Sequence, residues 1–178
     1  MKVFIEKQKF NQTWLWVLLS FSGLMPIIIL GAGLYVQLGL GKPFGNNPMS
    51  DTGLITVFLL TVALMVGMVL LFAFSKLELR IDKRDLRIRF IPFIIREKII
   101  PWSEVSSWEV VKYNPIRDYG GWGLRYGRNG KAYNVKGDKG LRINFHKGKP
   151  LLIGTSKPEV LQVFLQELDS LKKSASAE

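Results

Sequence analysis

Two long runs without a charged residue constrain this chain more than any other feature of its sequence. Residues 11–41 and 52–75 contain no Asp, Glu, Lys or Arg. Their most apolar parts, about residues 14–36 and 53–75, are each long enough to cross a hydrocarbon core of about 30 Å at about 1.5 Å per helical residue. The sequence therefore predicts two transmembrane helices, which form a transmembrane hairpin within residues 1–75.

The first run also follows three lysines, an arrangement that a cleaved signal peptide shares. Signal peptides have an apolar core of only about 7–15 residues and end in a small-residue cleavage pattern. This run is longer and lacks that pattern, so we interpret it as a permanent anchor. In the second run, Ala63 and Gly67 are small residues four positions apart, and we expect them to pack on the first helix.

Basic residues flank the outer ends of the two runs, and the segment between them has only one Lys and one Asp. Lysines precede the first run at Lys2, Lys7 and Lys9, and the second is followed by Lys76 and Arg80. Cytoplasmic flanks of membrane helices carry an excess of Lys and Arg. The sequence therefore predicts a multi-pass protein of the cell inner (cytoplasmic) membrane, with both termini in the cytoplasm.

The remaining charge is distributed unevenly along the chain. Residues 1–75 carry 4 basic and 2 acidic side chains, whereas residues 76–178 carry 21 and 12. This asymmetry predicts a domain boundary near residue 76. The chain has no cysteine and one histidine, His146, which excludes thiolate metal sites and multi-histidine sites. We expect no metal, no cofactor and no enzymatic activity.

The segment 76–173 alternates apolar and polar residues in short stretches separated by Gly, Pro, Asn and Asp. Such alternation indicates half-buried strands, and residues 82–85 are suited to a hairpin turn. Many short strands at this spacing predict a small antiparallel sandwich or barrel. The expected strands are residues 77–82, 86–90, 93–100, 108–113, 122–126, 131–135, 141–145 and 151–153.

Near the C-terminus the period becomes helical. Ser156 and Glu159 have the spacing of a capping box, in which the two side chains cap the start of a helix reciprocally. The apolar residues that follow share one helical face and should bury against the sheet: Leu161, Phe164, Leu165, Leu168 and Leu171. Residues 174–178 continue no pattern and are expected to form a frayed tail.

Three motifs in this order resemble a known family. They are Ile-Ile-Pro-Trp-Ser-Glu-Val-Ser-Ser-Trp at 99–108, Gly-Trp-Gly-Leu-Arg at 121–125, and Leu-Leu-Ile-Gly-Thr-Ser-Lys-Pro-Glu-Val at 151–160. The chain resembles the bacterial pleckstrin-homology-like (PH-like) membrane proteins, an uncharacterised family. The resemblance implies an α+β membrane protein: a two-helix transmembrane hairpin followed by a PH-like cytoplasmic domain, an antiparallel β-barrel or sandwich capped by a C-terminal α-helix. It implies no catalytic residues.

Basic side chains around the first predicted hairpin are candidates for contact with anionic lipid. Each Lys or Arg near a charged leaflet contributes about 1 kcal/mol. Eukaryotic PH domains that bind phosphoinositides place basic residues at the corresponding hairpin, although Asp82 and Asp85 depart from that pattern. The alternative is that these residues are solvated outward positions that set the topology. The candidates are Arg80, Lys83, Arg84, Arg87 and Arg89.

The stretch 119–130 interleaves five glycines with aromatic residues and arginines. It lacks the Gly-Lys-Ser/Thr ending of a phosphate-binding loop. Trp122, Arg125, Tyr126 and Arg128 would form a contact surface for a protein or for the membrane interface. Alternatively, the glycines serve the fold by permitting tight bends.

Two functions follow from this organisation. The first is a membrane-anchored, non-enzymatic interaction or scaffold domain that docks a protein partner or self-associates at the cytoplasmic membrane face. The alternative is binding of anionic-lipid headgroups by a lipid sensor or a lipid-handling protein. Nucleic acid is not an expected partner, because the charge is spread over strands in a domain held near the bilayer.

Overall fold

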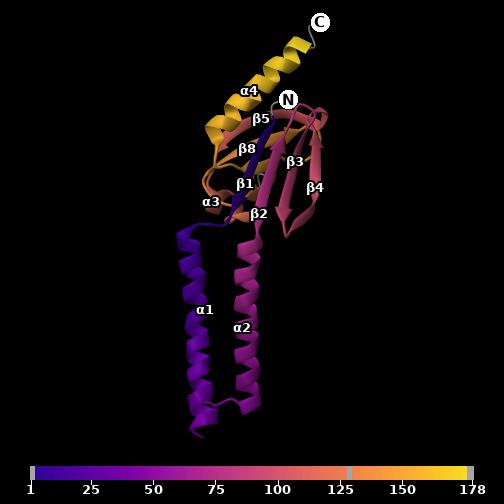
Figure 1. The fold of residues 1–178 in the computed structure, drawn as a ribbon. Helices are drawn as coiled ribbons and strands as arrows, with labels where there is room; N and C mark the ends of the chain where they lie inside the picture. The colour runs from indigo at the N-terminus through magenta and orange to yellow at the C-terminus, as the bar shows by residue number, and fades with distance from the viewer. Residues whose placement is uncertain (1–2, 128–129, 176–178) are drawn as a thin grey trace. The chain divides into compact units, whose positions relative to one another are not determined.

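The computed structural model describes residues 3–127 and 130–175, with side chains as far as residue 171. The chain divides into two compact units (Figure 1). The helical unit contains residues 11–73. The sheet unit joins the N-terminal segment, through residue 10, to the segment that begins at residue 74.

The helical unit consists of two long helices. Helix α1 (Thr13–Leu34) continues into a π-helical turn, η1 (Tyr35–Gly39), and α2 spans Asp51–Phe74. Both are long and apolar enough to cross a membrane, and only 17% and 6% of their most apolar windows are buried. A core helix of a soluble protein would be mostly buried, so this apolar surface requires a covering of lipid or protein. The two predicted helices are present.

The contact between the two helices differs from the prediction. Gly67 has no heavy atom within 4 Å of a Cβ built on it, and Ala63 is exposed. The small residue at the contact is Gly23 of α1, where a Cβ would overlap the side chain of Met65. The prediction that Ala63 and Gly67 pack on the first helix is therefore wrong, because that face of α2 points away from α1.

The loop between the helices contacts the helix ends through hydrogen bonds and packing. The Gln37 amide donates to the Met49 carbonyl oxygen at 2.8 Å and to Asp51 Oδ1 at 2.7 Å. Phe44 packs on Gly33, where a Cβ would lie 2.7 Å from Phe44 Cδ1. The turn-rich segment thus closes the hairpin with specific contacts.

The described part of the sheet unit contains two sheets. The first is entirely antiparallel, in the order β1-β2-β3-β4. The second has the order β5-β8-β9-β7-β6. The strands of the first sheet are β1 (Phe4–Lys9), β2 (Lys76–Ile81), β3 (Asp85–Ile91) and β4 (Ile94–Pro101). Those of the second are β5 (Val105–Lys112), β6 (Gly123–Gly127), β7 (Gly130–Asn134), β8 (Lys139–Phe145) and β9 (Leu151–Gly154).

One pair in the second sheet, β7 with β9, is parallel, whereas the sequence predicted antiparallel pairing throughout. The pair begins where the Lys131 N–H donates to the Pro150 carbonyl oxygen at 3.0 Å. Gly130 makes this approach possible, because its φ is 102° and a Cβ there would overlap the Pro150 carbonyl.

The two sheets share one core without forming a closed barrel. The rings of Phe90 on β3 and Tyr133 on β7 are 6.5 Å apart across the core. Fully buried residues come from both sheets, among them Leu77, Ile88 and Ile143. No strand pairing joins the two sheets within the described residues. The predicted α+β class with two N-terminal apolar helices is therefore present, and the barrel alternative is not.

Strand β1 was not among the predicted strands, since residues 4–9 were grouped with the transmembrane hairpin. It is paired along its full length with β2, from Phe4 opposite Ile81 to Lys9 opposite Lys76. The strand precedes α1 and its partner follows α2, so both outer ends of the helical hairpin lead into one sheet. If the helices cross a membrane, those two ends must lie on the same side of it.

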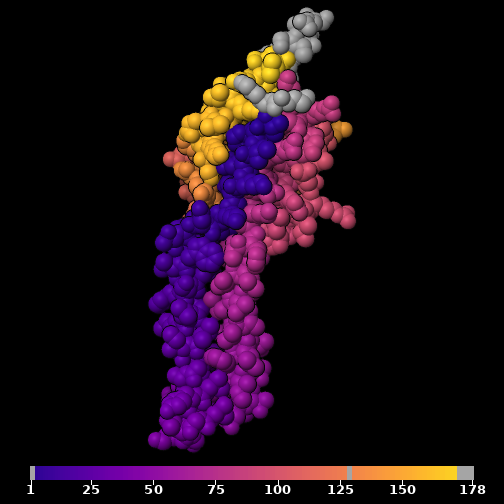
Figure 2. Space-filling view, in the orientation of Figure 1, coloured from indigo at the N-terminus to yellow at the C-terminus, as the bar shows by residue number. Residues whose placement is uncertain are grey.

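Helix α4 (Pro158–Ala175) covers part of the sheet unit and lies alongside β1 (Figure 2). It buries Leu161, Leu165 and Leu168, as predicted, whereas Leu171 is 48% exposed. The rings of Phe164 and Phe4 are 5.9 Å apart. The apolar face of the helix therefore packs against β5 and β8 of the second sheet, and Phe164 also contacts the N-terminal strand.

The capping of α4 differs from the predicted capping box. The Ser156 N–H donates to Glu6 Oε1 at 2.7 Å, and Thr155 Oγ1 donates to Glu6 Oε2 at 2.6 Å. Glu159, the predicted capping residue, instead pairs with Lys139 at 3.0 Å. Glu6 therefore binds the two residues that precede the helix, because β1 brings its buried carboxylate there.

Two short helices complete the unit. The 3-10 turn η2 (Trp102–Glu104) links β4 to β5, and α3 (Pro115–Tyr119) follows β5. Asn114 caps α3, because its side-chain oxygen accepts from the N–H groups of Ile116 and Arg117 at 3.1 and 2.9 Å.

Candidate functional site

The predicted basic residues lie on the outer face of the first sheet and its β2–β3 turn, and two of them have polar partners. Arg87 binds the Asp85 carboxylate through Nε at 2.6 Å and Nη2 at 3.2 Å, with Glu97 at 3.8 Å. Arg89 Nε donates to the Ile95 carbonyl oxygen at 2.9 Å. Arg80 is exposed on β2, directly opposite Arg87. The predicted basic surface is thus partly neutralised by its own acidic neighbours.

The predicted turn at 82–85 is present and explains its acidic residues. Asp82 Oδ1 accepts from the N–H groups of Arg84 and Asp85 at 2.8 and 3.0 Å. Burial acts to raise the pKa of Asp82, but these backbone hydrogen bonds and nearby arginines lower it overall. The turn holds Lys83 and Arg84 in exposed positions at its tip.

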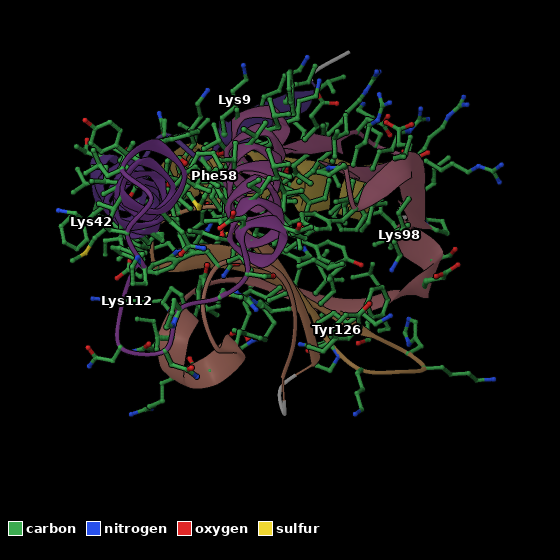
Figure 3. The ribbon with its side chains drawn as sticks, turned by 90° about the horizontal axis from the view of Figure 1, so that it is seen from below. Lys9, Lys42, Phe58, Lys98, Lys112 and Tyr126 are labelled. Carbon is green, nitrogen blue, oxygen red and sulfur yellow. The ribbon has the colours of Figure 1, made fainter. Side chains whose placement is uncertain are left out.

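Two residues of the glycine-rich stretch bond to backbone carbonyls within the sheet unit. Trp122 Nε1 donates to the Gly137 carbonyl oxygen at 3.1 Å, and Arg125 Nε donates to the Trp122 carbonyl oxygen at 2.9 Å. Tyr126 on β6 is 69% exposed, with Lys131 Nζ 5.3 Å from its ring centroid (Figure 3). Arg128, the fourth predicted contact residue, lies outside the described residues. Trp122 and Arg125 therefore have partners within the fold.

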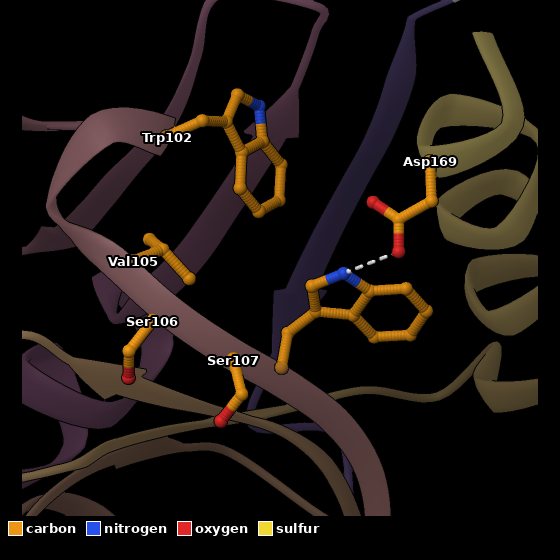
Figure 4. Close-up of a pocket in the computed structure, with 6 residues that line it drawn as sticks. Trp102, Val105, Ser106, Ser107 and Asp169 are labelled. Carbon is orange, nitrogen blue, oxygen red and sulfur yellow. Dashed lines mark hydrogen bonds between the residues drawn. The ribbon is translucent and has the colours of Figure 1, made fainter. Parts of the chain in front are cut away.

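A cavity of about 370 Å³ lies beside the start of β5, under the second half of α4 (Figure 4). The sequence analysis did not propose this cavity as a site. We call it the tryptophan cavity. Its lining residues are Trp102, Val105, Ser106, Ser107, Trp108 and Asp169.

Polar bonds position both indole rings of the tryptophan cavity. Trp108 Nε1 donates to Asp169 Oδ2 on α4 at 3.1 Å, as the dashed line in Figure 4 shows. Trp102 Nε1 donates to the Asp82 carbonyl oxygen at 2.9 Å. Ser107 Oγ accepts from Asn144 at 2.9 Å. The cavity wall is therefore held by contacts to α4, to the 82–85 turn and to β8.

The strand that borders the cavity is at the edge of its sheet. Among the described strands, β5 pairs with β8 alone. The Tyr113 N–H donates to the Asp138 carbonyl oxygen at 2.8 Å, which fixes the alternation of the antiparallel ladder. By that alternation, the N–H and C=O groups of Trp108, Val110 and Lys112 are directed away from β8. An extended segment could pair with this edge.

The sequence analysis singled out part of this site but did not predict that it lines a cavity. The segment Trp102-Ser-Glu-Val-Ser-Ser-Trp108 supported the family resemblance but was not proposed as a contact surface. Its tryptophans, six positions apart with three serines between them, were the available local signal. Asp169 lies 61 positions from Trp108, and no local pattern joins the two.

The sequence matches no protein-family model and no curated protein.

Proposed function

We propose that this chain is a membrane-anchored, non-enzymatic interaction protein. In this proposal the β5 edge docks an extended segment of a protein partner, or of a second copy, at the cytoplasmic membrane face. The observation that carries the proposal is the combination of an edge strand with the adjoining tryptophan cavity.

Strand addition explains how such an edge recognises a peptide. Main-chain hydrogen bonds to the outward groups of Trp108, Val110 and Lys112 would supply affinity for any extended backbone. Selectivity would come from a side chain placed in the tryptophan cavity, because alternate residues of an added strand face the same side. Large aromatic side chains with a polar atom are enriched at protein interfaces. Because serines and Asp169 share the lining with the two tryptophans, the cavity suits an aromatic side chain that carries a polar atom.

The residues that line the tryptophan cavity favour binding of a partner over catalysis. Of its six residues, Asp169 is the one carboxylate, and it already accepts the Trp108 indole N–H. The exposed charges of Glu109 and Lys112 farther along β5 would discourage indiscriminate strand pairing. Ser106 and Ser107 are small and exposed, so the part of β5 beside the cavity stays accessible.

Binding of anionic-lipid headgroups is the alternative. It would rest mainly on Arg80, Lys83 and Arg84, which are exposed. Hydrogen exchange of the 82–85 turn in the full-length protein tests it, in nanodiscs of neutral or anionic lipid. Slower exchange in anionic lipid that is lost when all three residues are changed to Gln would favour this alternative. The full chain is required because residues 76–178 alone lack β1.

Photo-crosslinking of the full-length protein in its own membranes tests the docking proposal. A benzophenone amino acid at Ser106 is expected to give a discrete adduct, because the residue faces the tryptophan cavity. Val110→Pro removes an outward N–H and should abolish the adduct, whereas Val110→Ala keeps the N–H and should preserve it. The mass of the adduct distinguishes a partner from a second copy.

Two controls make the result specific. The same amino acid at exposed Lys147, in the loop after β8, should give no matching adduct. Circular dichroism must show that Val110→Pro retains the fold, which we expect because proline is tolerated where its missing N–H would face outward. No adduct at Ser106, or an adduct that survives Val110→Pro, would contradict the proposal.

A further inference from the structure

The turn between β3 and β4 is apolar and exposed, unlike an ordinary turn in water. We use the name β3–β4 turn for residues 91–95, which are the two-residue turn and the adjoining strand ends and read Ile-Pro-Phe-Ile-Ile. Phe93 is 49% exposed and Ile95 is 65% exposed. Polar residues and glycine dominate turns in water, so five consecutive apolar residues at this position need an explanation.

Strand register places this turn at a particular end of the first sheet. Ile91 lies opposite Lys76, and Lys76 lies opposite Lys9. Helix α2 ends at Phe74, so Lys76 follows the helix by two residues. Because neighbouring strands are about 5 Å apart, the turn begins about 5 Å from a residue that is tied to the end of α2. A membrane that contains α2 is therefore within reach of the turn.

The turn is held in shape by contacts within the first sheet. The ring of Phe93 meets that of Phe90 edge-on, with centroids 5.5 Å apart. Arg89 Nε donates to the Ile95 carbonyl oxygen at 2.9 Å, where the β3–β4 register shifts. The apolar side chains are thus presented by a braced backbone.

Basic residues surround the apolar turn. Arg96 is exposed on β4, and Lys9 is exposed on β1. The acidic residues nearby are engaged, because Glu78 pairs with Lys76 at 3.1 Å and Glu97 lies 3.8 Å from Arg87. Apolar side chains ringed by Lys and Arg are the composition of surfaces that bind anionic bilayers.

The turn at the other end of β3 provides a contrast within the same sheet. Residues 82–85 read Asp-Lys-Arg-Asp and are closed by hydrogen bonds to Asp82. Two hairpin turns that share one strand therefore differ completely in polarity. The apolar one lies at the end of the sheet from which the chain continues into α1 and α2.

We propose that the β3–β4 turn is a membrane-contact surface that inserts Phe93 and Ile95 into the headgroup region of an anionic bilayer. Arg96 then lies against the lipid phosphates. The contact involves different residues from the docking edge on β5 and does not depend on it. This contact would attach the sheet unit to the bilayer at a third point, besides the two chain connections to α1 and α2.

Site-directed spin labelling tests this proposal directly, because the chain contains no cysteine. Phe93→Cys, Ile95→Cys and Lys83→Cys are each labelled with a nitroxide in the full-length protein in nanodiscs that contain anionic lipid. Collisions with oxygen should exceed those with a water-soluble nickel chelate at positions 93 and 95. The reverse is expected at position 83, on the polar turn. Adding Arg96→Gln should shift position 95 toward the aqueous pattern.

Two results would overturn the proposal. Aqueous collision patterns at both 93 and 95 would show that the turn stays in water. Protection from both reagents would show that protein covers it instead. Ile95→Cys keeps the test decisive if Phe93→Cys disturbs the contact with Phe90, and circular dichroism checks that each variant is folded.

Discussion

The helical unit and the sheet unit use the same apolar residue types in opposite ways. On α2, Leu64 is 65% exposed, whereas Leu77 and Ile88 of the first sheet are fully buried. The sheet unit places charged and polar residues outward and apolar residues inward, as a protein surrounded by water must. The helical unit is apolar on all sides. The difference indicates that the two units are built for two solvents, so equivalent substitutions should have different consequences in each.

A charge in the core of the sheet unit should have the largest effect. Ile88→Asp places a carboxylate at a fully buried position without a partner, which costs several kcal/mol. We expect the sheet unit to lose its cooperative unfolding transition, as measured by circular dichroism. A cooperative transition near that of the wild type would show that this core is not the one described.

The matching change in the helical unit should affect membrane integration instead. Leu64→Asp on α2 is expected to cost about 2.5–3.5 kcal/mol of insertion free energy and to leave the sheet unit folded. Extraction by alkaline carbonate measures the loss. On a helix surrounded by water, the same exposed substitution would change stability by less than about 0.5 kcal/mol. Unchanged retention in the membrane would therefore contradict the two-solvent comparison.

Removing the contact between β1 and the segment before α4 should have the next largest effect on stability. Glu6→Ala leaves two donors at the start of α4 without their acceptor, at about 1–3 kcal/mol each. Lys7→Ala on the same strand removes an exposed pair with Glu78 and should cost about 0–1 kcal/mol. Denaturant unfolding of both variants measures the difference, and equal losses would argue against the role of Glu6 in binding the segment before α4.

A buried tyrosine predicts sensitivity to alkaline pH. Burial raises the pKa of Tyr113 to about 12, despite the hydrogen bond from Asn134. Folding therefore favours the protonated phenol: its contribution is complete below the ordinary pKa of about 10 and is lost as the pH rises toward 12. The loss should be on the order of 2–3 kcal/mol. Tyr113→Phe should flatten this dependence in unfolding experiments between pH 9 and 12, and an equally steep decline in the variant would contradict the assignment.

A partly buried carboxylate should give the smallest effect on stability, at acidic pH. Burial acts to raise the pKa of Glu78, but Lys76, Lys7 and Arg89 lower it overall. Its contribution is therefore present above the ordinary pKa and is lost as the pH falls through the lowered value. Glu78→Gln should reduce this acid sensitivity by less than about 1 kcal/mol in pH-dependent unfolding. A larger change would indicate that the pair is more strongly coupled than its exposure suggests.

Local patterns in the sequence predicted most of the elements. The apolar runs located α1 and α2, and alternation located the strands from β2 onward. Strand β1 was missed because its inward positions include Glu6 and Gln8, which break the apolar pattern. Those two residues are buried against Thr155 and Gly154, almost the whole chain length away. Their polarity is explained only when the two ends of the chain are brought together.

The candidate site was less accessible to sequence reasoning than the fold. The basic residues were located correctly on outward positions, but Arg87 and Arg89 turned out to have partners. The proposed docking edge on β5 depends on strand order, which is not encoded locally. Its cavity needs Asp169 from α4 beside Trp108 from β5. Only the identities of the tryptophans and serines were visible beforehand.

Cysteine accessibility tests the central claim, that the chain is a membrane hairpin with the sheet unit on the cytoplasmic side. Asn46→Cys lies in the loop between α1 and α2, and Lys83→Cys lies in the β2–β3 turn. A membrane-impermeant maleimide added to intact cells should label position 46 at once and position 83 only after permeabilisation. Equal labelling of both positions in intact cells, or labelling of position 83 alone, would contradict the account.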